Sequence, residues 1–206
     1  MSDTNSIKIG MFGGGGVGKT CITLRYLKGE FSDGYIPTIE DEFSKTIEVD
    51  GKTVSLTVID TAGQDDFAEM RYSYFKSVKG FVFVFDISNP QSIEDLRNIY
   101  KDAEDAVDDE IVCVIAANKA DLRGDSNKTD LVPEDEYKKL EDEFHCKVIE
   151  TSAKVNKGID ELFLAIIREK LKPKGSSSPE AKKTEKSSGS KKEKEGGGEG
   201  GCCNIA

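Results

Sequence analysis

The sequence has little of what several enzyme classes require. It contains one histidine, His145, and no tryptophan. A metal site built from several histidines is therefore excluded, and a Ser-His-Asp site would depend on that single side chain. The cysteines have neither the spacing of zinc ligands nor that of a disulfide framework, which is typical of a protein from a reducing compartment. The five cysteines are Cys21, Cys113, Cys146, Cys202 and Cys203.

Long apolar runs are also scarce, and in most of the chain positive charges are outnumbered by negative ones. No stretch approaches the length of a transmembrane helix, and the N-terminal residues MSDTNSIKIG contain no apolar core of signal-peptide length. Residues 1–168 contain 20 Lys and Arg against 33 Asp and Glu, a net charge of −13. Such an acidic globule would be repelled by nucleic acid and by anionic lipid, so we expect no nucleic-acid partner. Residues 169–206 carry +3, and any affinity for a membrane is expected there.

The first 171 residues alternate short apolar runs with helical periodicities, the pattern of an α/β sheet in one domain. Asp50-Gly51 lies between two of the runs and predicts a tight hairpin turn. The last two runs, residues 81–87 and 111–116, are almost entirely apolar, as expected for central parallel strands that are buried on both faces. The runs that predict strands are residues 7–12, 43–49, 54–59, 81–87 and 111–116.

The end of the domain is marked by a helix with a regular apolar face. We predict that this helix closes a domain of residues 1–171. Residues 172–206 contain Lys, Ser, Gly and Glu with almost nothing apolar, so we expect a disordered tail. The residues with helical spacing are Ile159, Leu162, Phe163, Ile166 and Ile167.

A glycine-rich segment follows the first predicted strand and precedes a predicted helix. Its glycines let successive backbone N–H groups approach phosphate oxygens, and the helix points its positive end at the same anion. Lys19 can reach the β- and γ-phosphates, and the Thr20 hydroxyl can ligate Mg²⁺. A glycine-rich turn without a ligand is the alternative, and the motif alone does not separate GTP from ATP. The segment is Gly13-Gly14-Gly15-Gly16-Val17-Gly18-Lys19-Thr20, which matches G-x-x-x-x-G-K-[ST].

Two further segments follow predicted strands. In Asp60-Thr61-Ala62-Gly63-Gln64, Asp60 is placed to hold Mg²⁺ through water. Gly63 can bring its backbone N–H to the γ-phosphate, and Gln64 can orient the attacking water. An Asp-Thr turn capped by glycine is the alternative interpretation of this segment alone.

Asn118-Lys119-Ala120-Asp121 follows the apolar run 111–117. The Asp121 carboxylate can accept hydrogen bonds from N1–H and the N2 amino group of guanine, which adenine cannot match. The Lys119 stem can cover the base, and Asn118 can tie this loop to the glycine-rich segment at residues 13–20, called the phosphate loop below. Backbone donors for the guanine oxygen are expected from Thr151-Ser152-Ala153-Lys154.

Together with Tyr35-Ile36-Pro37-Thr38-Ile39-Glu40-Asp41, these motifs closely resemble the Ras family of small GTPases, in its Ras and Rap branch. The resemblance implies a P-loop NTPase fold, with a six-stranded, mostly parallel sheet flanked by helices. It implies that Thr38 ligates Mg²⁺ in the GTP state, that Phe31 packs across the guanine and that Tyr35 closes over the phosphates. Cys21 is also expected at the nucleotide, and residues 35–41 are expected to bind effectors.

Three positions depart from the family's pattern. Ile36 replaces an acidic residue that Ras and Rap usually carry, which affects the choice of effectors. Gly14 replaces the usual alanine of the phosphate loop. Gly10 lies in the first predicted strand where a β-branched residue is common, and we expect it to weaken that strand. Because Gln64 is retained, the resemblance favours an active hydrolase.

The last four residues, Cys203-Asn204-Ile205-Ala206, fit the C-a-a-X prenylation signal, and the terminal Ala favours farnesyl. Because one lipid chain anchors weakly, we expect a second signal, for which palmitate at Cys202 is favoured over the lysines of the tail. The predicted location is the cytoplasmic face of the plasma membrane, with endomembranes as the alternative.

The resulting hypothesis is a monomeric switch that binds GDP or GTP with Mg²⁺. Gln64 and Lys19 are its predicted catalytic residues. Its expected partners are effectors, a guanine-nucleotide exchange factor and a GTPase-activating protein. Two alternatives stay open, a module that holds nucleotide without turnover and a P-loop enzyme that uses ATP.

Overall fold

The computed structural model describes residues 5–34, 38, 40–63 and 68–172, which belong to one compact unit, Met1–Pro173. Two groups of predictions lie outside these residues, those on the tail beyond Lys172 and those on several loop positions. The loop positions are Tyr35, Ile36, Pro37, Ile39 and Gln64, and the tail positions include Cys202 and Cys203.

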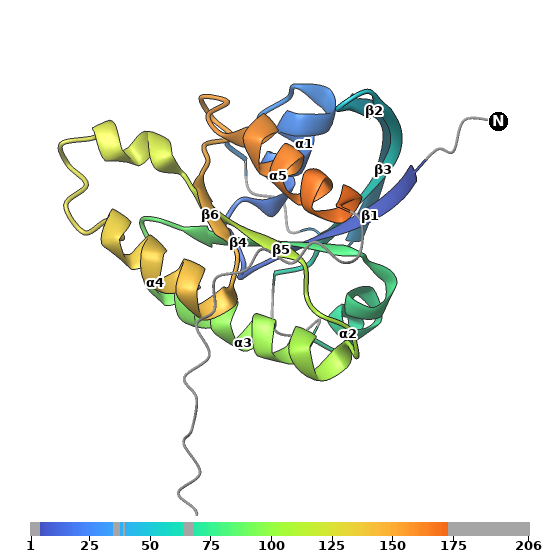
Figure 1. The fold of residues 1–206 in the computed structure, drawn as a ribbon. Helices are drawn as coiled ribbons and strands as arrows, with labels where there is room; N and C mark the ends of the chain where they lie inside the picture. Colours follow the sequence, from blue (N-terminus) through green and yellow to red (C-terminus); the bar gives the residue numbers. More distant parts are fainter. Residues whose placement is uncertain (1–4, 35–37, 39, 64–67, 173–206) are drawn as a thin grey trace, which may run out of the picture. The chain divides into compact units, whose positions relative to one another are not determined.

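In the described part of the chain, strands and helices alternate as predicted (Figure 1). The strands are β1 (Asn5–Phe12), β2 (Glu40–Val49), β3 (Lys52–Thr61), β4 (Gly80–Asp86), β5 (Cys113–Asn118) and β6 (Lys147–Glu150). The helices are α1 (Lys19–Lys28), α2 (Ala68–Ser77), α3 (Gln91–Ala106), α4 (Glu134–Phe144) and α5 (Ile159–Leu171), with a short 3₁₀ helix, η2 (Ala120–Gly124).

The strands form one six-stranded sheet in the order β2-β3-β1-β4-β5-β6. Only the β2–β3 pair is antiparallel, so the predicted six-stranded, mostly parallel sheet is confirmed. The turn between β2 and β3 has positive φ at Asp50 (51°) and Gly51 (74°), the backbone of a type I′ hairpin turn. The hairpin predicted from Asp50-Gly51 is therefore also confirmed.

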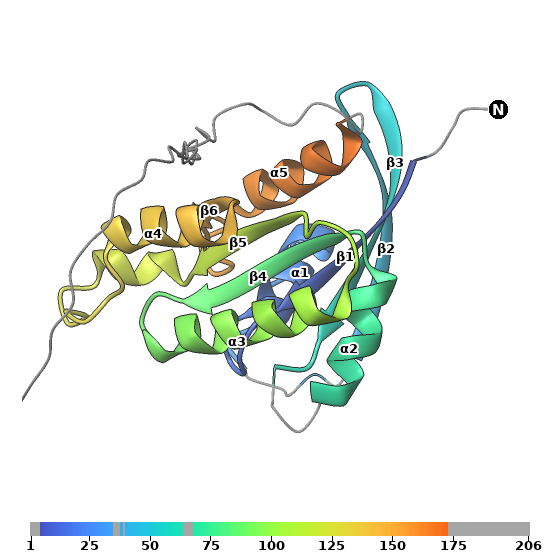
Figure 2. The same ribbon diagram turned by 60° about the horizontal axis from the view of Figure 1, so that its bottom comes forward.

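Helices cover both faces of the sheet, because the central strands are apolar on both sides. In β4, Val82 and Val84 belong to a core shared with α1 and α5, whereas Phe81, Phe83 and Phe85 belong to a core shared with α2, α3 and α4. Figure 2 shows α2 and α3 on the face of the sheet opposite α5. This two-residue alternation is what a parallel strand between two helix layers requires.

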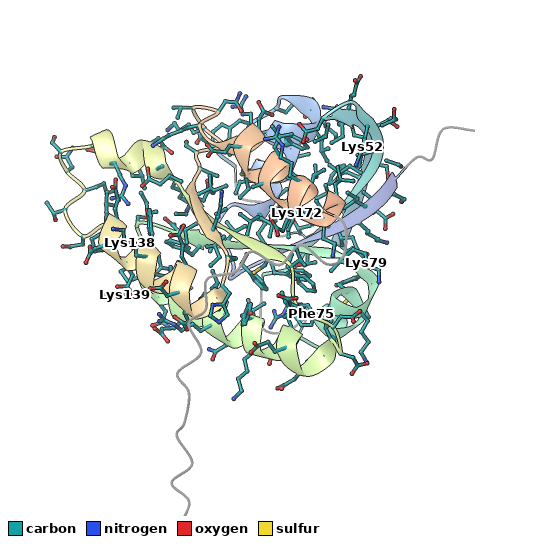
Figure 3. All side chains as sticks on the ribbon, viewed as in Figure 1. Lys52, Phe75, Lys79, Lys138, Lys139 and Lys172 are labelled. Carbon is teal, nitrogen blue, oxygen red and sulfur yellow. The ribbon has the colours of Figure 1, made fainter. Side chains whose placement is uncertain are left out.

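The two cores contain the large side chains, and charged side chains surround them. In Figure 3, Phe75 of α2 lies inside the molecule, where it is 1% exposed. All of the labelled lysines are exposed. The apolar face predicted for α5 is entirely buried. Among the described helices, none is both long and apolar enough to span a membrane.

Gly10 has a packing role that its sequence context did not show. It lies two residues before Phe12 in β1, on the same face of the strand. A β-carbon at position 10 would lie 2.4 Å from the Phe12 ring. That ring packs against Phe75 and Phe81, with centroids 4.9 and 5.5 Å away. The glycine therefore makes room for an aromatic cluster between β1, β4 and α2.

Candidate functional site

A cavity of about 450 Å³ lies where the loops after β1, β3, β5 and β6 meet residues 31–34 and 38, which lie between α1 and β2. This volume is in the range of small-molecule binding sites. Because β1, β3, β5 and β6 are parallel neighbours or near-neighbours in one sheet, their carboxyl ends converge on it. The cavity is lined by Gly15, Gly16, Gly18, Lys19, Thr20, Cys21, Leu24, Phe31, Ser32, Asp33, Gly34, Thr38, Thr61, Gly63, Asn118, Lys119, Asp121, Leu122, Ala153 and Lys154.

The glycine-rich loop wraps the start of α1 with backbone in the left-handed region. Gly13 (φ 146°) packs so closely on β4 that a β-carbon would lie 2.2 Å from the Val84 carbonyl oxygen. Gly18 (φ 99°) immediately precedes α1, and a β-carbon there would lie 2.3 Å from Nδ2 of Asn118. Larger residues would therefore push the loop away from both neighbours. The N-terminus of α1 therefore lies at the cavity, which Lys19, Thr20 and Cys21 line. The first N–H groups of a helix have no partner within it and are suited to bind anions.

Lys19 is the first residue of α1, directly after this loop, and is 6% exposed. Its Nζ donates hydrogen bonds to the carbonyl oxygens of Gly13 and Gly14, each at 2.9 Å. Burial lowers the pKa of Lys19 to about 8, against the attraction of Asp60. A buried ammonium group is costly unless an anion pairs with it. The site is thus prepared for a ligand with several negative oxygens.

Three oxygen-bearing side chains meet beside this lysine. The Thr20 hydroxyl donates to Oδ2 of Asp60 at 2.6 Å and lies 2.8 Å from the Thr38 hydroxyl. Asp60 is fully buried, and its Oδ1 has no hydrogen-bond partner among the described residues. Burial raises the pKa of Asp60 to about 6.

A buried carboxylate oxygen without a partner needs an explanation, and a hard cation supplies one. Hydroxyl and carboxylate oxygens are the ligands Mg²⁺ prefers, and Mg²⁺ usually takes one or two carboxylates, with water and phosphate completing its shell. The described residues contain no group of three or more His, Cys, Asp and Glu side chains that could hold a metal. Thr20, Thr38 and Asp60 thus fit a Mg²⁺ ion that is shared with a phosphate ligand.

The other end of the cavity is built around Asn118, which is 2% exposed. Its Nδ2 donates to the Val17 carbonyl at 2.8 Å, and its Oδ1 accepts from the Thr151 hydroxyl at 3.2 Å. The link from this loop to the phosphate loop, which the sequence predicts, is present. Asn118 also ties both loops to the segment after β6.

Asp121 faces the cavity, and its Oδ1 accepts a hydrogen bond from the Ser152 hydroxyl at 2.5 Å. This bond fixes the orientation of the carboxylate. Ala153 and Lys154 line the cavity next to it. Arg25 of α1 holds their backbone in place, since its Nε and Nη2 donate to the carbonyls of Ala153 (2.7 Å) and Lys154 (3.2 Å).

Comparison with known proteins agrees with this geometry. The family model described as "Ras family" matches residues 8–172. "Protein ras-1" of Neurospora crassa is 38% identical over 167 residues, which cover 81% of this chain and 76% of that protein. "Ras-like protein rasB" of Dictyostelium discoideum is 36% identical over 186 residues, which cover 88% of this chain and 92% of that protein. The chain belongs to the Ras family.

The Ras-family motifs do not all reach the cavity wall. Gly15, Gly16, Gly18, Lys19, Thr20, Cys21, Phe31, Thr38, Gly63, Asn118, Lys119, Asp121, Ala153 and Lys154 line it. Four other predicted residues lie directly behind that lining, where they hold it by the contacts given above. These four are Gly13, Val17, Asp60 and Ser152.

Sequence reasoning missed several residues of this Ras-family site. Asp86, at the end of β4, pairs with Nζ of Lys119 at 2.6 Å. Arg71 of α2 is 4% exposed and lies close enough to Lys19 to help lower its pKa. Asp86, Arg71 and Arg25 belong to none of the motifs, and the strand and helix periods contain no signal for contacts between distant elements. Two other lining residues had a signal in the sequence, because Thr61 lies within the Asp60–Gln64 segment and Leu122 directly follows Asp121.

Proposed function

We propose that this Ras-family protein is a switch that binds GDP or GTP with Mg²⁺ and slowly hydrolyses GTP to GDP and phosphate. The observation that carries the proposal is a single cavity with two different ends. One end has the buried ammonium of Lys19 and an Asp60 carboxylate oxygen that has no partner in the part of the chain the structure describes, and these suit a Mg²⁺-polyphosphate. The other has an oriented carboxylate at Asp121, which suits a base that donates hydrogen bonds.

Preference for guanine follows from the chemistry of Asp121. Its carboxylate can accept hydrogen bonds from N1–H and the N2 amino group of guanine. Adenine has no amino group at that position, so it would leave the carboxylate without a donor, and such a loss discriminates strongly. The Ser152 hydroxyl supports the choice because it holds Asp121 in one orientation. Phe31 and the Lys119 stem line the cavity and offer surfaces to cover the base.

The chain's own residues would assist hydrolysis mainly by electrostatics and positioning. Amides of the phosphate loop and Lys19 would stabilise the negative charge that develops on the phosphate oxygens. Gln64, which lies outside the described residues, is the proposed group that orients the attacking water. A Mg²⁺ ion held by Thr20 and Thr38, and by Asp60 through water, would add positive charge beside the β- and γ-phosphates. An activating protein that supplies an arginine accelerates the Ras reaction by about 10⁵-fold, and we propose a similar partner here.

The switch itself would reside in Thr38 and Gly63. Both line the phosphate end of the cavity, so both can sense whether the γ-phosphate is present. We propose that the GTP form holds residues 35–41 in the conformation that effectors bind, and that an exchange factor renews the nucleotide. We also propose prenylation of Cys203 and palmitoylation of Cys202, with the protein on the cytoplasmic face of the plasma membrane.

Single-turnover hydrolysis by the full chain tests this function. We expect slow release of phosphate from Mg²⁺-GTP, little from Mg²⁺-ATP, and a slower reaction still for Gln64→Leu. Tight GTP binding without turnover would instead identify a nucleotide-holding module. Turnover of ATP with equal ease would contradict the role given to Asp121.

A further inference from the structure

Two cysteines far from the cavity lie side by side at the start of neighbouring strands. β5 begins at Cys113, and Cys146 immediately precedes β6. The two strands are parallel, with Val114 opposite Lys147, so Cys113 and Cys146 are one step back in the same register. Neighbouring strands lie about 4.8 Å apart. Disulfides join Cα atoms that are roughly 4.4–6.8 Å apart, so this backbone spacing is compatible with one.

Both side chains lie on the same face of the sheet. Cys113 belongs to the core shared with α3 and α4, as does Ile115 two residues later. Cys146 and Val148 pack against the same core. Because side chains alternate along a strand, this pattern gives the two thiols a common direction. The neighbouring Cys113 thiol, together with burial, raises the pKa of Cys146 above its usual value.

The surroundings give the two thiols different access to solvent. Cys113 is 9% exposed, and its Sγ donates to the Phe144 carbonyl at the end of α4, at 3.9 Å. Cys146 is only partly buried. Tyr100 of α3 lies near both sulfurs, and its ring packs on Phe144 with centroids 4.5 Å apart. A small oxidant can therefore reach Cys146 first, while the more deeply buried Cys113 lies next to it in the strand register.

We propose that Cys113 and Cys146 form a dithiol site that hydrogen peroxide closes to an intramolecular disulfide within the native fold. In the first step the Cys146 sulfur attacks a peroxide oxygen, the O–O bond breaks, and one water leaves with the thiol proton. In the second step the Cys113 sulfur attacks the resulting sulfenic sulfur, the S–O bond breaks, and a second water leaves. The two thiols lose two electrons, and peroxide gains them. The Cys113 thiol and burial raise the pKa of Cys146, so little of the nucleophilic thiolate is present and the reaction requires excess peroxide.

The disulfide would join the beginnings of β5, which ends at Asn118, and β6, which is followed directly by Thr151. It would close a long loop that includes η2 and α4. Such a link stabilises a protein mainly by restricting the unfolded chain. If the native fold accepts it without strain, the melting temperature should rise by about 5–10 °C. This inference does not depend on the proposed function, because neither nucleotide binding nor hydrolysis enters its test.

Peptide mapping of the full chain tests the proposal. The protein is treated with excess hydrogen peroxide, its remaining thiols are blocked with N-ethylmaleimide, and it is digested with trypsin without reductant. Cleavage after lysine and arginine places each cysteine of the pair in its own peptide, residues 102–119 and residues 140–147. Cys21 lies in residues 20–25, and Cys202 and Cys203 lie in residues 195–206, so they serve as internal references.

We expect the linked pair of peptides to appear with peroxide and to disappear with dithiothreitol, together with the rise in melting temperature. Cys146→Ser and Cys113→Ala should both abolish the linkage and that rise. Recovery of both peptides as N-ethylmaleimide adducts after Cys21 has oxidised would overturn the proposal. So would oxidation of Cys146 to sulfinic acid without linkage, or a linked protein that melts below the reduced one.

Discussion

At position 10 the native backbone leaves no room for a side chain. A β-carbon there would lie 2.4 and 2.5 Å from two atoms of the Phe12 ring and 3.2 Å from Val78. We predict that Gly10→Ala lowers the free energy of unfolding by about 1–3 kcal/mol, because the aromatic cluster must shift to accept one carbon. Urea denaturation measures the change. Gly124→Ala is the matched control, since no atom of the described residues lies within 4 Å of its added β-carbon. Equal stability of both variants would show that the Phe12 ring moves aside freely.

From the sequence we expected Gly10 to weaken its strand. The structure shows a different constraint, because a larger residue at this position would collide with the Phe12 ring. Propensity describes one residue on an average strand, whereas this position is decided by an aromatic ring two residues away and a helix much later in the chain. The same reasoning explains which site residues could be found. The phosphate loop is a local pattern, so Lys19 and Thr20 were predicted. Asp86 meets Lys119 only when two strands are placed side by side, and no local pattern contains that pair.

Among the elements, three loops are joined by one side chain, Asn118. It holds the phosphate loop through the Val17 carbonyl and the segment after β6 through Thr151. We predict that Asn118→Ala accelerates release of bound GDP by at least about tenfold, because it leaves a buried carbonyl without its donor and frees the loops from each other. Release of a fluorescent GDP analogue measures this. Thr151→Val removes only one of the two bonds and should have a smaller effect.

Each result for that pair of variants has a distinct meaning. If Thr151→Val released GDP as fast as Asn118→Ala, the bond to the phosphate loop would contribute nothing. If neither variant changed release, the loops would be held by the rest of the sheet alone, and the role given to Asn118 would be wrong.

Most strands and helices could be predicted from the sequence, because their apolar residues recur with a regular period. β4 and α5 are buried along one continuous pattern, so their apolar periods predicted them. The strand predicted at residues 111–116 lies two residues later in the structure, where β5 extends over Cys113–Asn118. Apolar residues also precede the strand: the Val112 carbonyl accepts from the Phe81 N–H at 3.0 Å before the regular ladder begins. The contact between Cys113 and Cys146 could not be predicted, because it depends on the register of two strands separated by η2 and α4.

At the scale of the whole molecule, the buried carboxylate of the candidate site lowers the free energy of unfolding at neutral pH. Asp60 is fully buried, and burial raises its pKa from 3.8 to about 6. Below about pH 4 both the folded and the unfolded chain hold this proton. Between about pH 4 and 6 the folded chain keeps the proton that the unfolded chain has lost, so the free energy of unfolding falls as the pH rises. Above about pH 6 the loss is complete, on the order of 3 kcal/mol. Lys19, with its pKa at about 8, changes charge only at higher pH.

Asp60→Asn removes the charge and should therefore separate stability from ligand binding. With EDTA and without nucleotide, we predict that this variant is more stable than the wild type by about 1–3 kcal/mol at pH 7.5 and gains little at pH 4. It should also lose most of the stabilisation that Mg²⁺ and GDP give the wild type, because that oxygen no longer offers a charge to the cation. Urea denaturation at both pH values measures these differences.

Asp33→Asn makes the same substitution at an exposed position of the same cavity and should change the free energy of unfolding by less than about 0.5 kcal/mol. If Asp60→Asn were instead less stable at pH 7.5, with the wild-type dependence on pH, the buried carboxylate would be stabilised by the fold itself, and the cation would not be needed to explain it.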